Sequence, residues 1–155
     1  MFIRVVTGVY KHLPDRWLEW LCAGNIAWYG YKLTAPGVQW SNAEAWSFML
    51  STGLTETGWG WLCLLIGLLR ILALIVNGTF AGTWYSEVSP WVRALTAAGG
   101  ATFWFMVYLS VSNANSSGSA IYQLPLILDL YCSLRVVFLI GRTSVRNPPR
   151  HVGIS

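Results

Sequence analysis

Charged residues are scarce in this sequence. Only 10% of the 155 residues are Asp, Glu, Lys or Arg, whereas 55% are hydrophobic. Water-soluble domains carry about 25% charged residues, so this chain has too few to cover a water-facing surface. The composition argues against an ordinary soluble protein and indicates a membrane protein.

Groups suited to catalysis or metal binding are also rare. The two histidines, His12 and His151, lie outside the apolar segments, and there is neither a glycine-rich phosphate loop nor a Gly-x-Ser-x-Gly motif. The three cysteines, Cys22, Cys63 and Cys132, lie far apart in separate apolar segments, which argues against a disulfide framework and a metal site. We interpret them as small apolar side chains between helices. We therefore expect no enzymatic activity, no cofactor and no metal.

Long apolar runs are abundant. A helix that crosses a membrane needs about 20 predominantly apolar residues. We predict one all-α integral membrane domain over residues 1–155. Its four transmembrane helices are expected at about 17–33, 56–77, 91–110 and 120–141. The first is the least apolar, since it contains Glu19 and Asn25, and a tilted or half-buried helix is the alternative there. The ten tryptophans gather near the ends of these runs, as in interfacial aromatic belts.

Two shorter segments are predicted to be amphipathic. Residues 1–13 place apolar side chains on one helical face and polar ones on the other, which is typical of an arm on the membrane surface. Pro14 then fits the first turn of a new helix. Residues 41–50 begin with the capping box Ser41–Glu44 and predict a short interfacial helix, with a re-entrant hairpin as the alternative.

The distribution of Lys and Arg predicts the orientation. Basic residues precede the first predicted span, occur between the second and third, and recur in the tail, 142–155. Because such residues stay on the cytoplasmic side, we expect both termini and the second connection there. The tail arginines are expected to contact anionic lipid headgroups: Arg142, Arg146 and Arg150. The tail lacks the aromatic or groove-reading residues of a nucleic-acid site, so we expect no nucleic-acid partner.

Arg70 lies inside the longest apolar run. A cation there is costly unless it is paired or faces a polar cavity. Asp129 in the fourth run is the best counter-charge. Counted from the starts of their predicted spans, the helical rise places Arg70 about 20 Å and Asp129 about 14 Å from the outer membrane boundary, an offset that an arginine side chain can cover. We interpret them as a buried structural pair; a polar lumen or substrate pathway is the first alternative, and proton transfer through Asp129 the second. Arg135 is expected to extend towards the cytoplasm. The other polar residues in the spans are Glu19, Asn25 and Asn77.

Small residues predict where helices approach closely. Gly60, Cys63 and Gly67 share a face of the second predicted span with Arg70. The third predicted span has its own set: Ala94, Ala97, Ala98 and Ala101. Packing within one chain is the first expectation. Because four short helices enclose a pore poorly by themselves, we also expect homo-oligomers.

A set of spaced single residues supports a resemblance: Arg70, Asn77, Arg93, Trp104 and Asp129. Through them, residues 60–140 resemble a type of small polytopic membrane protein encoded by tailed bacteriophages of proteobacteria. The resemblance implies a phage gene and a bacterial inner membrane, but no particular activity. The amino-terminal third does not take part in it.

These observations together predict a small, self-associating inner-membrane protein. Its most concrete form is a holin-like protein that permeabilises the membrane. The alternative is a non-pore effector or scaffold that binds another membrane protein, for example to exclude superinfecting phage. A transporter subunit is the third possibility.

Overall fold

The chain folds into helices joined by short connections. The computed structural model describes residues 2–35, 46–79, 84–113 and 119–146. The helices are α1 (Phe2–Thr34), α2 (Ser47–Leu50), α3 (Glu56–Thr79), α4 (Trp84–Asn113) and α5 (Ser119–Arg146). The predicted all-α class is thus confirmed. Among the described residues, three stretches are long and apolar enough to cross a membrane: Glu56–Val76, Val88–Asn113 and Ser119–Arg142.

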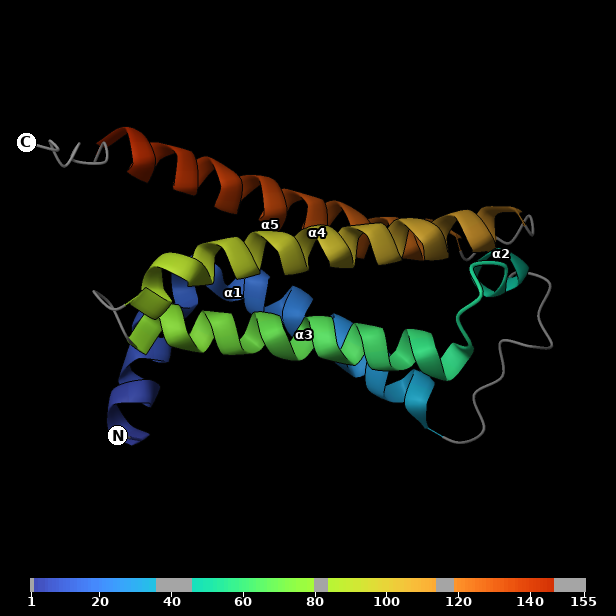
Figure 1. The fold of residues 1–155 in the computed structure, drawn as a ribbon, viewed down its shortest axis with the longest axis horizontal. Coiled ribbons are helices and arrows are strands. Elements are labelled where there is room, and N and C mark those ends of the chain that lie inside the picture. Colours follow the sequence, from blue (N-terminus) through green and yellow to red (C-terminus); the bar gives the residue numbers. More distant parts are fainter. Residues whose placement is uncertain (1, 36–45, 80–83, 114–118, 147–155) are drawn as a thin grey trace, which may run out of the picture.

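The four long helices form an elongated bundle (Figure 1). α1 and α3 run antiparallel, as do α3 and α4, and α4 and α5. The start of α1, the end of α3, the start of α4 and the end of α5 therefore lie together at what we term the connection end. The short helix α2 lies at the opposite end, termed the α2 end.

α1 differs from the sequence prediction. The expected arm at 1–13 and the expected span at 17–33 form one helix, and Pro14 lies inside it. Proline lacks the N–H for one helical hydrogen bond and favours a bend, and the first turns of α1 point away from the bundle (Figure 1). Of the predicted helix at 41–50, the structure has α2; residues 41–45, with the capping box, lie outside the described residues. Residues 142–146 of the predicted tail continue α5.

Glycines allow α1 and α3 to touch along their backbones. A Cβ atom placed on Gly67 would lie 2.6 Å from the Cβ of Ala27, and one on Gly30 would lie 2.4 Å from the backbone nitrogen of Leu64. Such distances leave no room for any side chain. The predicted small face of α3 is therefore the surface that packs on α1.

The core near the α2 end is aromatic. The rings of Tyr29, Phe103 and Trp104 meet edge to face, with centroids 5.1–5.6 Å apart. The indole nitrogen of Trp59 donates a hydrogen bond to the carbonyl oxygen of Met49 in α2, at 3.3 Å. Because α2 is tied to this cluster, it closes the core at that end.

Gly67→Ala is expected to destabilise the bundle by about 1–3 kcal/mol, because the added methyl overpacks the α1–α3 contact. Gly24→Ala is the matched control, since nothing lies within 4 Å of its Cβ position. It should leave stability unchanged or raise it by up to about 1 kcal/mol, the helix preference of alanine over glycine. Unfolding of both variants in detergent, followed by circular dichroism, measures the difference. Equal stability of the two variants would contradict the described α1–α3 packing.

α1 and α5 meet at two buried cysteines, Cys22 and Cys132. Both belong to one small buried cluster together with Ala97 of α4. A small oxidant such as iodine should therefore join them into an intramolecular disulfide, with loss of two hydrogens that mass spectrometry detects. Cys63→Ala should still form the bond, and Cys22→Ala should not. A Cys22–Cys63 product would show that the helices are arranged differently.

Candidate functional site: a buried ionic layer

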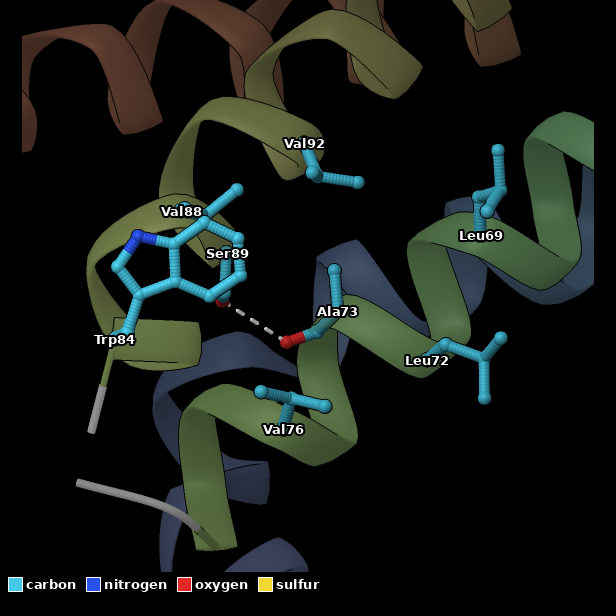
Figure 2. Close-up of a pocket in the computed structure, with 8 residues that line it drawn as sticks. All are labelled: Leu69, Leu72, Ala73, Val76, Trp84, Val88, Ser89 and Val92. Atoms are coloured by element: carbon cyan, nitrogen blue, oxygen red, sulfur yellow. Dashed lines mark hydrogen bonds between the residues drawn. The ribbon is translucent and has the colours of Figure 1, made fainter.

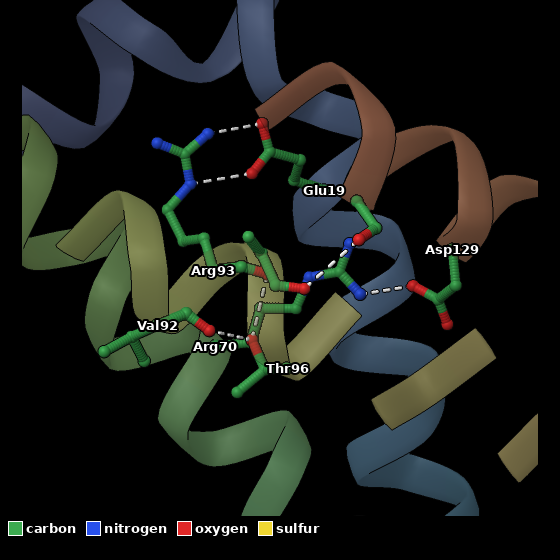
Figure 3. A network of polar contacts seen from close by, with 8 residues as sticks. Glu19, Arg70, Val92, Arg93, Thr96 and Asp129 are labelled. Atoms are coloured by element: carbon green, nitrogen blue, oxygen red, sulfur yellow. Dashed lines mark hydrogen bonds and ion pairs between the residues drawn. The ribbon is translucent and has the colours of Figure 1, made fainter. Parts of the chain in front are cut away.

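Two ion pairs lie inside the bundle, and the first joins α1 to α4. Arg93 donates two hydrogen bonds to Glu19, from Nε to Oε2 at 2.8 Å and from Nη2 to Oε1 at 2.6 Å. Both side chains are almost fully buried, with exposed fractions of 4% and 2%. Figure 3 shows the planar guanidinium facing the carboxylate. This two-bond geometry is the strongest form of the interaction, and it fixes how α1 and α4 lie relative to each other.

The second pair joins α3 to α5. The guanidinium of Arg70 donates through Nη1 to Oδ1 of Asp129, and both side chains are buried, with exposed fractions of 0% and 1%. Figure 3 shows Arg70 reaching across the interior to Asp129. The structure thus brings together the two residues that the sequence singled out, and it does so within a single chain.

Asp129 lies in a narrow space between helices. A Cβ atom on Gly100 of α4 would lie 2.7 Å from its Oδ2 atom, so only glycine fits there. Oδ2 has no direct hydrogen bond, and the same holds for Nε and Nη2 of Arg70 and for Nε1 of Trp104. The indole of Trp104 and the thiol of Cys22 nevertheless lie close enough to interact with the carboxylate. The pair therefore occupies a polar spot within an apolar interior.

Four arginines, one from each long helix, lie at nearly the same level along the bundle: Arg16, Arg70, Arg93 and Arg135. Two hydrogen bonds between helices set this level. Ser133 donates to the carbonyl of Ala94 at 3.3 Å, which places Arg135 beside Arg93. Ser89 donates to the carbonyl of Ala73 at 3.1 Å. Arg70 precedes Ala73 in α3, so it lies about one helical turn further from the connection end than this contact. We term this set the arginine layer, and it lies in the part of the bundle nearer the connection end.

The arginine layer contains more positive than negative charge. Glu19 and Asp129 are its buried carboxylates among the described residues. Arg16 lies near enough to Arg93, Arg135, Glu19 and the exposed Asp15 to interact with them electrostatically. Arg16 and Arg135 are both half-buried. Among the described residues, the layer thus holds four arginines beside two buried carboxylates and the exposed Asp15.

The remaining predicted site residues fall into three groups. Those buried between helices are Gly60, Cys63, Gly67, Ala94, Ala97 and Ala101, whereas Ala98 points outwards. Asn25 is exposed on α1, and Arg142 is exposed on α5, with its guanidinium over the ring of Phe138 at 4.4 Å. The side chains of Asn77 and Arg146, and all of Arg150, lie outside the described residues.

The described residues include the linings of two surface hollows. One, of about 180 Å³, is a groove between α3 and α4, lined by Leu69, Leu72, Ala73, Val76, Trp84, Val88, Ser89 and Val92 (Figure 2). Since the hydroxyl of Ser89 is bonded to Ala73, this groove presents an apolar lining. The other, of about 170 Å³, is a crevice between α1 and α5, lined by Leu21, Cys22, Asn25, Leu124, Pro125, Leu128 and Asp129.

Comparisons with protein-family models, with curated proteins and with solved structures find no match for this chain.

The sequence prediction missed the Glu19–Arg93 pair. From the sequence, Glu19 is predicted only as a polar residue of the first span, and Arg93 appears only among the residues that carry the resemblance. A signal was nevertheless present, because each is a charged residue a few positions inside its predicted span, near the end that the basic residues predict to be cytoplasmic. An unpaired charge within a membrane span has a high free-energy cost, so two such residues of opposite sign at the same depth are expected to pair.

Breaking the Glu19–Arg93 pair on one side should cost about 3–5 kcal/mol, because the remaining charge stays buried without its partner. We expect Glu19→Leu and Arg93→Met each to destabilise the protein by this amount. The double variant should recover most of the loss, since apolar pairs replace buried ion pairs at little cost. Unfolding of the purified protein in detergent gives the three free energies. Arg142→Met, which changes an exposed arginine, serves as the control, and additive single effects would contradict direct pairing.

Proposed function

We propose that this chain is a multi-pass protein of the bacterial inner membrane whose closed helical bundle binds another membrane component and does not open a pore. The observation that carries the proposal is the pairing of buried charges inside one chain. Among the described residues, the two buried carboxylates, Glu19 and Asp129, bond to arginines of the same bundle. These charges are therefore used to hold the helices together.

We further propose that α1 is a fourth span. It packs on α3 through Gly30 and Ala27, and its Glu19 bonds to α4. Because α1 is held against two apolar helices in this way, it lies at the same depth in the membrane as they do. Four spans place the start of α1 and the end of α5 on the same side as the α3–α4 connection, and the basic residues favour the cytoplasm for that side.

The outer surface supports a lipid-facing bundle. The exposed large side chains of α3 and α5 are overwhelmingly apolar, among them Leu65, Leu72, Ile121, Ile127 and Leu134. A pore built from several copies needs a polar face on each copy to line the water-filled lumen. The charged residues that would serve are turned inwards here, and the remaining outer surface suits acyl chains.

The resemblance of residues 60–140 to phage membrane proteins gives this proposal its biological setting. A non-pore effector in the inner membrane of an infected bacterium, such as one that excludes a second phage, fits a protein that binds and does not conduct. The holin-like function stays a prediction from the sequence, and the experiment below distinguishes the two.

Inducible expression in bacteria loaded with a membrane-potential dye tests the proposal. We expect the potential to stay intact while the protein accumulates in the inner membrane, because the exposed large side chains of the described helices are overwhelmingly apolar. Immunoblots of membrane fractions must show that the protein is present, and a known pore-forming protein provides the positive control. Rapid depolarisation at modest expression would contradict the proposal and favour the holin-like function.

A further inference from the structure

An amide lies on the outer surface of α1, near the middle of the apolar part of the bundle. Asn25 is exposed, and it precedes Ala27 by two residues, which correspond to about 3 Å along the helix axis. Ala27 meets Gly67 of α3, and Gly67 lies near the middle of the apolar stretch Glu56–Val76. With α1 as the proposed fourth span, Asn25 therefore lies deep in the hydrocarbon region of the membrane.

The bundle itself offers this amide no partner among the described residues. Asn25 is described, and no hydrogen bond involves its side chain. Thr102 of α4 is exposed as well, but its hydroxyl donates to the carbonyl of Ala98 in its own helix, at 3.0 Å. Thr102 is thus satisfied while it faces lipid. Acyl chains provide neither a donor nor an acceptor for the Asn25 amide, and asparagines at this depth commonly bond to another helix.

The surface around Asn25 has room for such a helix. Leu21 and Trp28 lie on the same side of α1, four residues before and three after, with exposed fractions of 50% and 59%. Nothing lies within 4 Å of the Cβ position of Gly24, so a neighbouring backbone can approach closely there. Asn25 also lines the crevice of about 170 Å³ between α1 and α5. A cavity of about 150 Å³ holds benzene, so the crevice can accept one side chain.

The chemistry of the amide favours a second copy of this chain as the neighbour. An amide carries both a donor and an acceptor, so two asparagines can bond to each other. Copies inserted in the same orientation, and related by a two-fold axis along the membrane normal, present the same surface at the same depth. Asn25 then meets the Asn25 of the second copy without any offset along the axis. Leu21 and Trp28 meet their own counterparts in the same way.

We propose that two copies of the chain associate side by side through α1, with the Asn25 amides bonded to each other inside the membrane. This inference rests on the proposed fourth span, because the amide needs a partner only when α1 is surrounded by lipid. The contact leaves each closed bundle intact, since both ion pairs stay within their own chain. A single pair of neutral amides encloses no lumen, so the dimer is consistent with a protein that forms no pore.

Sedimentation equilibrium of the full-length protein, in density-matched detergent, tests the amide contact. We expect a monomer–dimer equilibrium that Asn25→Leu weakens about tenfold, the effect of one hydrogen bond between membrane helices. Asn25→Gln keeps the amide and should retain most of the affinity. Thr102→Val removes a polar group from an exposed position that needs no partner, and it should leave association unchanged. Elution volume and helical content verify that each variant folds.

Cysteine cross-linking tests which surface makes the contact. In a chain whose three native cysteines are replaced by alanine, Leu21→Cys and Trp28→Cys are introduced one at a time. Iodine added to membranes should join two copies through the new residue, since two thiols lose two hydrogens to the oxidant, which is reduced to iodide. Dimers should appear on non-reducing gels. Leu65→Cys, on an exposed position of α3, is the matched control and should stay monomeric.

Two results would overturn the dimer: equal association of the original chain and Asn25→Leu, or cross-links through Leu65→Cys without any through Leu21→Cys. A chain that stays monomeric at every concentration would do the same, and would leave a different membrane protein as the neighbour of Asn25. Labelling of Asn25→Cys by a membrane-impermeant maleimide separates the two proposals. Rapid labelling would contradict the fourth span together with the dimer, whereas a monomer that resists labelling would contradict the dimer alone.

Discussion

A charge inside a membrane must be neutralised by a partner or it prevents the fold from forming. The desolvation cost of one ion amounts to several kcal/mol even after the protein relaxes. In this bundle Glu19 bonds to Arg93 and Asp129 bonds to Arg70. The two pairs connect α1 to α4 and α3 to α5, so each long helix holds one end of one pair. Apolar packing alone allows helices to slide in a lipid environment, whereas these pairs permit one register.

The glycines and the aromatic cluster depend on that register. Gly67 fits against Ala27, and Gly100 fits against Asp129, only when the helices are aligned as the ion pairs require. A shift by one turn would replace these contacts with larger side chains. Towards the α2 end, the rings of Tyr29, Phe103 and Trp104 pack on one another under the same constraint. Packing and pairing therefore specify the same arrangement, which is the mark of a sequence that selects one structure.

Much of the fold was predictable because apolar length and periodicity are properties of the sequence itself. The all-α class and three of the four predicted spans followed from them, whereas the span predicted at 17–33 is not among the described helices apolar enough to cross a membrane. Arg70 with Asp129 followed from depth and charge. The Glu19–Arg93 pair did not, because pairing between α1 and α4 depends on which helices become neighbours. The continuous α1 was missed for a different reason. Pro14 suits the first turn of a helix, yet a long helix tolerates it with a bend.

Whether the pairs form within one chain is decided by co-expression of two charge-reversed copies. Arg70→Asp and Asp129→Arg should each prevent stable accumulation when expressed alone, and the two changes in one chain should restore it. The structure predicts that the two single variants, expressed together from separate genes, remain unstable, because the partner of each residue lies in its own bundle. Recovery of both chains in the membrane fraction, at the level of the double variant, would show pairing between copies and contradict the closed bundle.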